Sequence, residues 1–394
     1  MFDFVFEDCS LPSAGDTVLV GLSGGVDSTL AALLLKEKGL HVIGVTMSLW
    51  DGSVARSGNA QTKTKIKDAC YGPGESEDIE ECKRFCEKYG IEYHVVDVSA
   101  RYKEIVLEYF KSEYRSGRTP NPCIMCNRNI KFGAMLEAVS GLGIKYDYFC
   151  TGHYARIVRP NKGVWETDIR PFMIGMASDV FKDQTYFLYR IPSEVLSKVR
   201  FPLAYLKKSE VLELARKANL EAADKDESQD FIAKEYRDSL FSDKQSVPGD
   251  IIDLDGHILG QHKGIEHYTI GQRKGLEISV GYPVYVHSID AKNNLVILAK
   301  KEELDSSSLI ADDFVWPGNI EPPKAFEAMV KIRLASKPVP CKVSRYLKND
   351  GDYKGNAWLI EFEKPQRGVA PGQSAVLYVD GVIVGGGVIA KGVK

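Results

Sequence analysis

The chain has 394 residues, of which 27% are charged, and its formal net charge is −3 at pH 7. This length predicts two or three domains rather than one. The slightly acidic balance excludes a uniformly basic nucleic-acid-binding protein, so any nucleic acid must meet local positive charge. No apolar run is long enough to cross a membrane, and neither a signal peptide nor a disulfide framework is indicated. We therefore expect a cytoplasmic protein without membrane contact.

The first 150 residues alternate predicted strands and helices. Strands are predicted at 17–20, 41–47, 91–98 and 146–151, and helices at 29–38, 75–89, 102–114 and 131–139. This alternation predicts an α/β fold with a doubly wound parallel sheet, whose ligands bind at the carboxyl ends of the strands. Ser23, Met47 and Gly152 should therefore surround one crevice. The polar segment 51–67 is expected to be a mobile loop.

The first strand leads through a glycine- and serine-rich turn into the first helix. The turn consists of Gly21, Leu22, Ser23, Gly24, Gly25, Val26, Asp27 and Ser28. Backbone N–H groups in such a turn, together with a helix N-terminus, bind phosphate. The two serine hydroxyls can donate to phosphate oxygens, and Asp27 either holds Mg²⁺ or caps the helix. The Walker pattern is absent, and the turn resembles the PP-loop of the ATP pyrophosphatases, which activate an oxygen by adenylation.

The second half of the chain has a different pattern. Residues 202–222 are predicted to be helical, and from 246 onward short strands are separated by glycine, proline and Asp-Gly turns. Asp255-Gly256 and Asp380-Gly381 are hairpin signals. Residues 328–388 are predicted to form a small antiparallel β-barrel. We expect a catalytic domain at 1–200, a small central adaptor at 201–278 and a C-terminal β-barrel domain at 279–394.

Residues 121–127, Asn-Pro-Cys-Ile-Met-Cys-Asn, are predicted to form an extended loop because prolines occupy positions 120 and 122. Cys123 and Cys126 can be a redox pair, half of a metal site, or a nucleophile and its neighbour. Nearby cationic side chains would lower a thiol pKa. The alternative is that both cysteines are small apolar residues of the core.

Two further segments carry polar side chains next to predicted strands or helices. Thr151-Gly152-His153-Tyr154-Ala155-Arg156 closes a strand, so His153 and Arg156 are expected to face phosphates. Lys182-Asp183-Gln184 precedes an apolar run, where Asp183 is either an N-terminal helix cap or part of a binding surface.

These segments occur in a fixed order together with His262-Lys263-Gly264-Ile265, the run from Tyr268 to Leu276, and Ala370-Pro371-Gly372-Gln373-Ser374. The ordered set resembles the tRNA-specific 2-thiouridylases over nearly the whole chain. This resemblance implies a sulfurtransferase that uses ATP and Mg²⁺ to adenylate O2 of a wobble uridine in tRNA. Sulfur from a donor protein or a persulfide source then replaces this oxygen, leaving 2-thiouridine, AMP and pyrophosphate.

The resemblance also implies residue roles. ATP would lie against residues 21–28, with Met47 near the adenine and Gly152 beside the nucleotide, and Asp27 would act in catalysis. Cys126 falls at the position of the catalytic nucleophile of this family. The target base or the tRNA would be contacted by Asn121, Pro122, Cys123, His153, Lys182, Asp183, Gln184, Arg333, Leu334 and Gln373.

One departure from the family pattern concerns the sulfur chemistry. The usual second cysteine, which carries sulfur as a persulfide, is missing after Glu227-Ser228-Gln229-Asp230, and Cys123 replaces the usual aspartate. Cys123 and Cys126 could act as a persulfide pair, or they could ligate a [4Fe–4S] cluster whose third ligand is Asp230 or another cysteine. A catalytically degenerate tRNA-binding paralogue and another PP-loop ligase are the alternatives. Cys82 and Cys86 share one helix face and could bind metal with Cys70, although core packing is favoured.

Overall fold

The N-terminal region is built on a five-stranded sheet in which every neighbouring pair is parallel. The computed structural model describes residues 4–52, 69–225, 230–347, 353 and 356–394, so nearly all of the predicted loop at 51–67 lies outside the described residues. The strand order is β5 (Glu92–Asp97), β3 (His41–Ser48), β2 (Thr17–Gly21), β6 (Tyr148–Thr151) and β9 (Val199–Arg200). The four predicted strands are confirmed with small shifts at their ends, whereas the two-residue β9 was not predicted.

Helices cover both faces of this sheet, which confirms the doubly wound architecture. Val18 and Val20 of the central strand pack with apolar residues of α1 (Val26–Glu37) and α2 (Glu75–Tyr89). Leu19, on the opposite face, packs with Phe132 and Met135. This alternation follows from the two-residue side-chain period of a strand. Because β2, β3 and β6 are parallel, their carboxyl ends share one edge of the sheet.

A long helical segment runs beside the sheet. It comprises α3 (Ser99–Tyr102), the π-helix η1 (Lys103–Leu107) and α4 (Glu108–Arg115). A second segment comprises α5 (Pro122–Met125), the π-helix η2 (Cys126–Ala134) and α6 (Met135–Gly141). The prediction of an extended loop at 121–127 is therefore wrong. Pro122 occupies the first helical position, where its fixed φ and missing N–H favour the helix start.

The middle of the chain contains short helices and a second sheet. The predicted helix at 202–222 is confirmed only in part, as α8 (Lys208–Lys217); α7 (Ser193–Leu196) precedes it and α9 (Lys234–Arg237) follows. The sheet has the order β12 (Ile258–His262), β11 (Gly249–Ile252), β14 (Leu295–Ala299) and β13 (Tyr285–Asp290). The hairpin predicted at Asp255-Gly256 is present between β11 and β12. Strands on both sides of the expected limit at 278/279 share this sheet.

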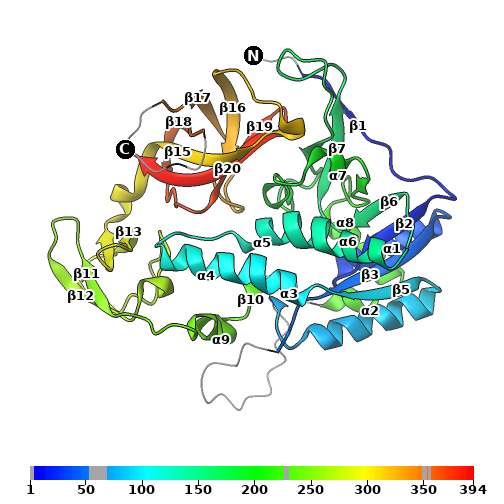
Figure 1. The fold of residues 1–394 in the computed structure, drawn as a ribbon, viewed down its shortest axis with the longest axis horizontal. Helices are drawn as coiled ribbons and strands as arrows, with labels where there is room; N and C mark the ends of the chain where they lie inside the picture. Colours follow the sequence, from blue (N-terminus) through cyan, green and yellow to red (C-terminus); the bar gives the residue numbers. More distant parts are fainter. Residues whose placement is uncertain (1–3, 53–68, 226–229, 348–352, 354–355) are drawn as a thin grey trace.

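Six antiparallel strands close into a barrel at the C-terminal end (Figure 1). They are β15 (Asp305–Val315), β16 (Ala325–Lys331), β17 (Val339–Arg345), β18 (Trp358–Arg367), β19 (Ser374–Val379) and β20 (Val382–Val393). The predicted barrel is confirmed, although it begins before residue 328. Asp380 and Gly381 both have positive φ, 50° and 74°, as a two-residue hairpin turn requires.

Three N-terminal strands extend the barrel sheet and connect it to the catalytic region. β8 (Met173–Met176) pairs with β20, β7 (Ala155–Pro160) pairs with β8, and β1 (Phe6–Asp8) pairs with β7. Within the described residues, no helix has the length and apolarity that a membrane crossing requires.

Candidate active site

The glycine- and serine-rich turn between β2 and α1 has the geometry of an anion site. The Ser28 hydroxyl lies 3.3 Å from the Ser23 hydroxyl and accepts a hydrogen bond from the Ser23 N–H at 3.2 Å. Gly24 has φ of +73°, which glycine adopts without strain. α1 begins at Val26 with no side-chain cap, so no side chain competes there with an anion for its first N–H groups.

Gly152 brings the end of β6 against this turn. A β-carbon at this position would lie 2.6 Å from the carbonyl carbon of Asp27 and 2.7 Å from the amide nitrogen of Ser28. No side chain fits in that space, so residue 152 has to be glycine for the two segments to meet. Met47 lies one residue before the end of β3 at the same sheet edge and is half-buried. The residues expected around one crevice are Ser23, Met47 and Gly152. They lie at the carboxyl ends of adjacent strands or in the turn that follows β2.

Asp27 is held by two partners that the sequence did not reveal. Its carboxylate oxygens accept hydrogen bonds from the Lys208 ammonium at 2.7 and 2.8 Å, and Oδ1 accepts one from the Tyr154 hydroxyl at 2.9 Å. Asp27 does not cap the helix, because the N-cap residue is Gly25. A Mg²⁺ ion bound to Asp27 would have to share the carboxylate with the Lys208 ammonium or displace it.

A second lysine from a distant segment contacts the turn directly. The Lys225 ammonium donates to the carbonyl of Gly24 at 3.3 Å and forms ion pairs with Asp78 and Glu81 of α2. Lys225 and Lys208 both come from residues after 200, which sequence analysis did not connect with the turn. Two cations therefore stand beside the place predicted for phosphate.

His153 is not a cationic phosphate ligand in this structure. It packs between the rings of Phe132 and Phe201, and burial, followed by the nearby Lys131 charge, lowers its pKa well below the usual value. The neutral ring lies 2.7 Å from the Thr151 hydroxyl through Nδ1. Arg156, also expected to face phosphates, instead donates to the Met176 carbonyl and pairs with Asp8.

The two cysteines of the 121–127 segment lie one helical turn apart and are both half-buried. Burial raises the pKa of Cys126 to about 11, and the Lys131 ammonium opposes this shift. Cys126 and Lys131 are five residues apart in η2, and the π-helical spacing places residues i and i+5 on one face. Lys131 is thus the cation available to stabilise a Cys126 thiolate.

None of the eight cysteines forms a disulfide bond. Cys82 and Cys86 lie in the apolar core, and burial raises the pKa of both thiols. They are core residues, and the alternative of a metal site shared with Cys70 is not supported. Among the described residues, the only group of three potential metal ligands within 4.8 Å of one another is Asp253, Asp255 and His257 on the β11–β12 hairpin.

The barrel fixes the segment that leads to the cysteines. The Gln373 amide donates to the carbonyls of Thr119 and Pro120 at 3.2 and 3.0 Å, and the Thr119 N–H donates to the Pro371 carbonyl at 2.7 Å. The N–H of Asn121, a residue only 6% exposed, donates to the Tyr109 hydroxyl. Gln373, expected to contact tRNA, uses its amide to position the start of α5.

Residues 182–184 divide between surface and interior. Asp183 is 4% exposed and accepts hydrogen bonds from the N–H groups of Ala177 and Thr185 and from the Thr185 hydroxyl. Gln184 accepts a hydrogen bond from the Tyr154 N–H. In this conformation the Asp183 carboxylate binds groups of the protein just before the 3₁₀ helix η3 (Thr185–Phe187), as in the cap-like alternative, and its contact with tRNA remains a prediction.

The remaining predicted tRNA residues lie on the barrel. Arg333 and Leu334 are exposed in the connection between β16 and β17, and the Arg333 guanidinium donates to the carbonyls of Arg367 and Gly368. This exposed connection is far along the chain from the turn at 21–28.

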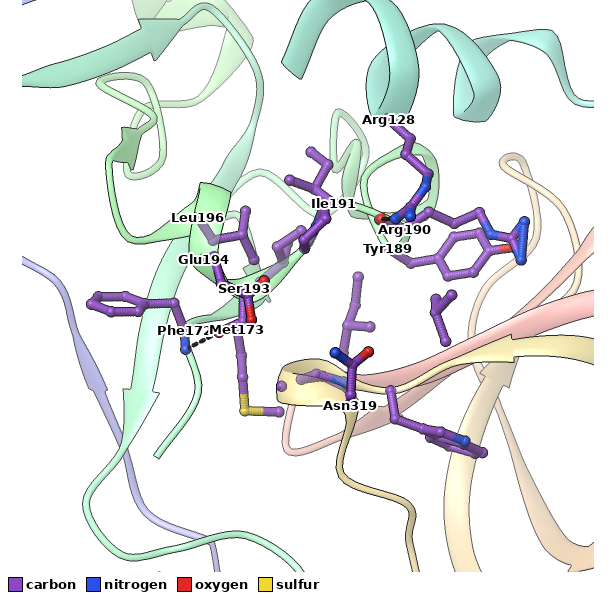
Figure 2. A pocket seen from close by; sticks show the side chains of 17 residues that line it. Arg128, Phe172, Met173, Tyr189, Arg190, Ile191, Ser193, Glu194, Leu196 and Asn319 are labelled. Carbon is purple, nitrogen blue, oxygen red and sulfur yellow. Dashed lines mark hydrogen bonds between the residues drawn. The ribbon is translucent and has the colours of Figure 1, made fainter. Parts of the chain in front are cut away.

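A cavity of about 170 Å³ lies elsewhere, between the Phe172–Leu196 region and the barrel residues Trp316–Asn319 (Figure 2). Arg128 and Arg190 meet at its edge, where Arg128 donates to the Arg190 carbonyl. Neither the turn at 21–28 nor any cysteine lines it. This cavity is therefore distinct from the candidate site.

Comparisons with known proteins cover nearly the whole chain. Family models match residues 16–234 (tRNA methyl transferase HUP domain), 237–300 (tRNA methyl transferase PRC-barrel domain) and 306–389 (aminomethyltransferase beta-barrel domain). The tRNA-specific 2-thiouridylase MnmA of Endomicrobium trichonymphae is 44% identical over 374 residues, which is 94% of this chain and 98% of that protein. The protein of the same name from Carboxydothermus hydrogenoformans is 40% identical over 381 residues, covering 95% and 97%.

One solved structure, a 4-thiouridine synthetase–RNA complex with bound ATP, is similar to 54% of this chain and 43% of its own, at 16% identity. Its TM-score of 0.33 is too low to add to the argument.

Proposed function

The chain belongs to the family of tRNA-specific 2-thiouridylases, and we propose that it catalyses ATP-dependent 2-thiolation of a wobble uridine in tRNA. The uridine O2 attacks the α-phosphorus of ATP, pyrophosphate leaves, and sulfur then displaces AMP from C2. The observation that carries this proposal is the anion-binding geometry of the turn at 21–28, found in a chain that is 44% identical to a tRNA-specific 2-thiouridylase.

Two charged residues connect the turn to the thiols. Asp78 lies against Gly24, where a β-carbon would be 3.1 Å from its carboxylate, and its charge also acts on the thiol of Cys70. Lys131 acts on Cys126 and on His153, which follows Gly152. These interactions support a shared site for a nucleotide at the turn and a base at the thiols, which adenylation followed by sulfur attack requires.

The proposed ATP site consists of residues 21–28, Met47 and Gly152. The α1 N-terminus and the serine hydroxyls would hold phosphate oxygens, and Lys208 and Lys225 would add positive charge as pyrophosphate leaves. Mg²⁺ would accompany the phosphates. Because Lys208 takes both oxygens of Asp27, no step is assigned to a metal ion on that carboxylate.

The proposed tRNA surface must admit a flipped base, because a stacked uridine cannot bring O2 to ATP. The start of α5 would contact the flipped base through Asn121, Pro122 and Cys123. The neutral ring of His153 can form a hydrogen bond with a base edge. Phe181 is 90% exposed next to Lys182, an arrangement that suits base stacking beside a phosphate contact. Arg333 and Leu334 would contact the tRNA from the barrel. A tRNA substrate also fits the cytoplasmic location expected from the sequence.

Sulfur could be held at Cys123 and Cys126 in two ways. As a thiol pair, they would accept sulfur from a persulfide donor, with Lys131 stabilising the thiolate. As ligands, they would supply two thiolates to a [4Fe–4S] cluster, which would hold an additional sulfide. Iron and sulfide analysis of anaerobically purified protein, repeated on Cys123→Ala and Cys126→Ala, separates the two. A cluster lost in both variants supports ligation, whereas iron-free protein that thiolates tRNA supports the thiol pair.

The function itself is tested by pyrophosphate release and nucleoside analysis. Purified protein, ATP, Mg²⁺ and a transcribed tRNA with a wobble uridine should release pyrophosphate, and the same tRNA with a wobble cytidine should not. Adding a persulfide donor should yield 2-thiouridine. Binding of tRNA without pyrophosphate release would instead indicate a degenerate paralogue. Transfer of a methyl group to tRNA would indicate a methyltransferase, the activity in the descriptions of two matching family models.

A further inference from the structure

A third thiol, Cys70, lies beside the cysteine helix. Cys70 is the middle residue of β4 (Ala69–Tyr71), which pairs in parallel with β10 (Asp230–Ile232). The register joins Ala69 to Asp230 and Tyr71 to Ile232, so Cys70 is level with Phe231 on the neighbouring strand. Phe231 directly follows Asp230, the end of the segment after which the family resemblance leads us to expect a cysteine.

One tyrosine connects the three thiols. Tyr102 stacks on Tyr71 with ring centroids 5.2 Å apart, and it shares an apolar cluster with Cys126 and Phe231. Burial raises the pKa of Tyr102, and charges on Cys126, Cys70 and Cys123 raise it further. The charge of Cys70 also raises the pKa of Cys126. Tyr102 therefore interacts electrostatically with all three thiols, although residues 70 and 126 are far apart in the chain.

The three thiols differ in access to solvent. Cys70 is exposed, whereas Cys123 and Cys126 are half-buried. The surrounding protein desolvates the Cys70 thiol and raises its pKa, while Lys131 opposes this shift. The Lys131 charge opposes the raised pKa of Cys126 as well, so one ammonium acts on both thiols. Residue 70 is thus accessible to a donor even though its thiol is partly desolvated, whereas the half-buried Cys126 lies where a substrate base would be enclosed.

We propose that Cys70 carries the transferable sulfur as a persulfide and that Cys126 releases it onto the tRNA. This inference rests on the proposed thiolation. Sulfur atoms of the three cysteines do not all lie within 4.8 Å of one another, so they are not a ready-made metal cage. A persulfide adds about 2 Å of reach beyond Sγ, which helps a relay between neighbouring thiols.

The Cys70 thiolate attacks the outer sulfur of the donor persulfide, and the donor thiolate leaves. The terminal sulfur on Cys70 then attacks C2 of the adenylated uridine, and AMP leaves with the C–O bond electrons. The Cys126 thiolate attacks Sγ of Cys70; the S–S bond breaks, its electron pair stays on the sulfur at C2, and a Cys70–Cys126 disulfide forms. A dithiol reductant restores both thiols.

The test compares Cys70→Ser with Cys9→Ser, which removes a half-buried thiol outside the site. With cysteine persulfide as donor, Cys70→Ser should keep tRNA-dependent pyrophosphate release but lose 2-thiouridine formation, and Cys9→Ser should keep both. If wild-type protein lacks tRNA-dependent pyrophosphate release, the proposed function fails and this inference with it. If Cys70→Ser thiolates tRNA at the wild-type rate, this inference alone fails.

A second measurement does not depend on the variant folding. Wild-type protein that turns over without reductant should contain a Cys70–Cys126 disulfide, detected by peptide mapping under non-reducing conditions. A disulfide between Cys123 and Cys126, with Cys70 left free, would overturn the proposal. Stoichiometric iron that is lost in Cys70→Ser would also overturn it, because Cys70 would then be a ligand rather than a sulfur carrier.

Discussion

Replacing Gly152 by alanine tests the close contact that builds the nucleotide site. The new methyl group would lie 2.6 Å from the Asp27 carbonyl carbon, 2.7 Å from the Ser28 nitrogen and 2.9 Å from the Asp27 oxygen. All three atoms belong to the backbone, so no side chain can rotate away. β6 and the turn must separate by about 0.8 Å to reach 3.4 Å, where such contacts become ordinary.

This displacement should affect activity more than stability. Overpacking costs about 1–3 kcal/mol of unfolding free energy, whereas a misplacement of about 1 Å can lower a rate about 100-fold. Urea unfolding and tRNA-dependent pyrophosphate release measure the two effects. Gly141→Ala is the control, since no atom lies within 4 Å of its β-carbon position. Wild-type pyrophosphate release by Gly152→Ala would refute the assignment of this contact to the nucleotide site.

Three further perturbations test individual side chains. Asp27→Ala should abolish ATP-dependent turnover and lower the unfolding free energy by no more than about 2 kcal/mol, because the pair with Lys208 is partly exposed; normal pyrophosphate release would contradict the PP-loop assignment. Alkylation of Cys126 by iodoacetamide should accelerate about tenfold per pH unit from pH 7 to 10, since the raised pKa of about 11 keeps the thiol protonated below it; a plateau near pH 9 would show an ordinary thiol. Asp183→Ala should lower the unfolding free energy by about 2–4 kcal/mol because buried donors lose their acceptor, and unchanged stability with weakened tRNA binding would restore its expected role at the surface.

Local patterns were sufficient to predict the framework. The β-branched run before Gly21 and the helix after Ser28 predicted the strand, turn and helix now seen as β2 and α1. The Asp380-Gly381 turn predicted a hairpin because those residues tolerate positive φ. The four predicted strands of the parallel sheet and the barrel are confirmed. The domain limits at 200/201 and 278/279 remain predictions.

Contacts between distant segments could not be predicted in this way. Lys208 reaches Asp27 across 181 positions, and nothing in either local sequence indicates the pair. The sequence pattern groups Cys70 with Cys82 and Cys86 because they are near in sequence, whereas in the structure Cys70 interacts electrostatically with Cys126.

The error at residues 121–127 has a local cause. The two prolines at 120 and 122 predict an extended segment, but proline at the first helical position favours a helix. The helix sets the spacing of Cys123 and Cys126 and places Lys131 on the face of Cys126. The observed helix therefore changes the chemistry expected of residues 121–127.

The most direct test of the central claim is mass analysis of nucleosides from tRNA treated with this protein, ATP, Mg²⁺ and cysteine persulfide. We expect 2-thiouridine in tRNA with a wobble uridine, formed in proportion to the AMP and pyrophosphate released. We expect none when the wobble base is cytidine or when ATP is omitted. If the protein releases pyrophosphate in response to tRNA but the tRNA stays unmodified, the protein adenylates without thiolating and the proposed thiolation is contradicted. Sulfur at any position other than C2 of the wobble uridine would also contradict the assignment.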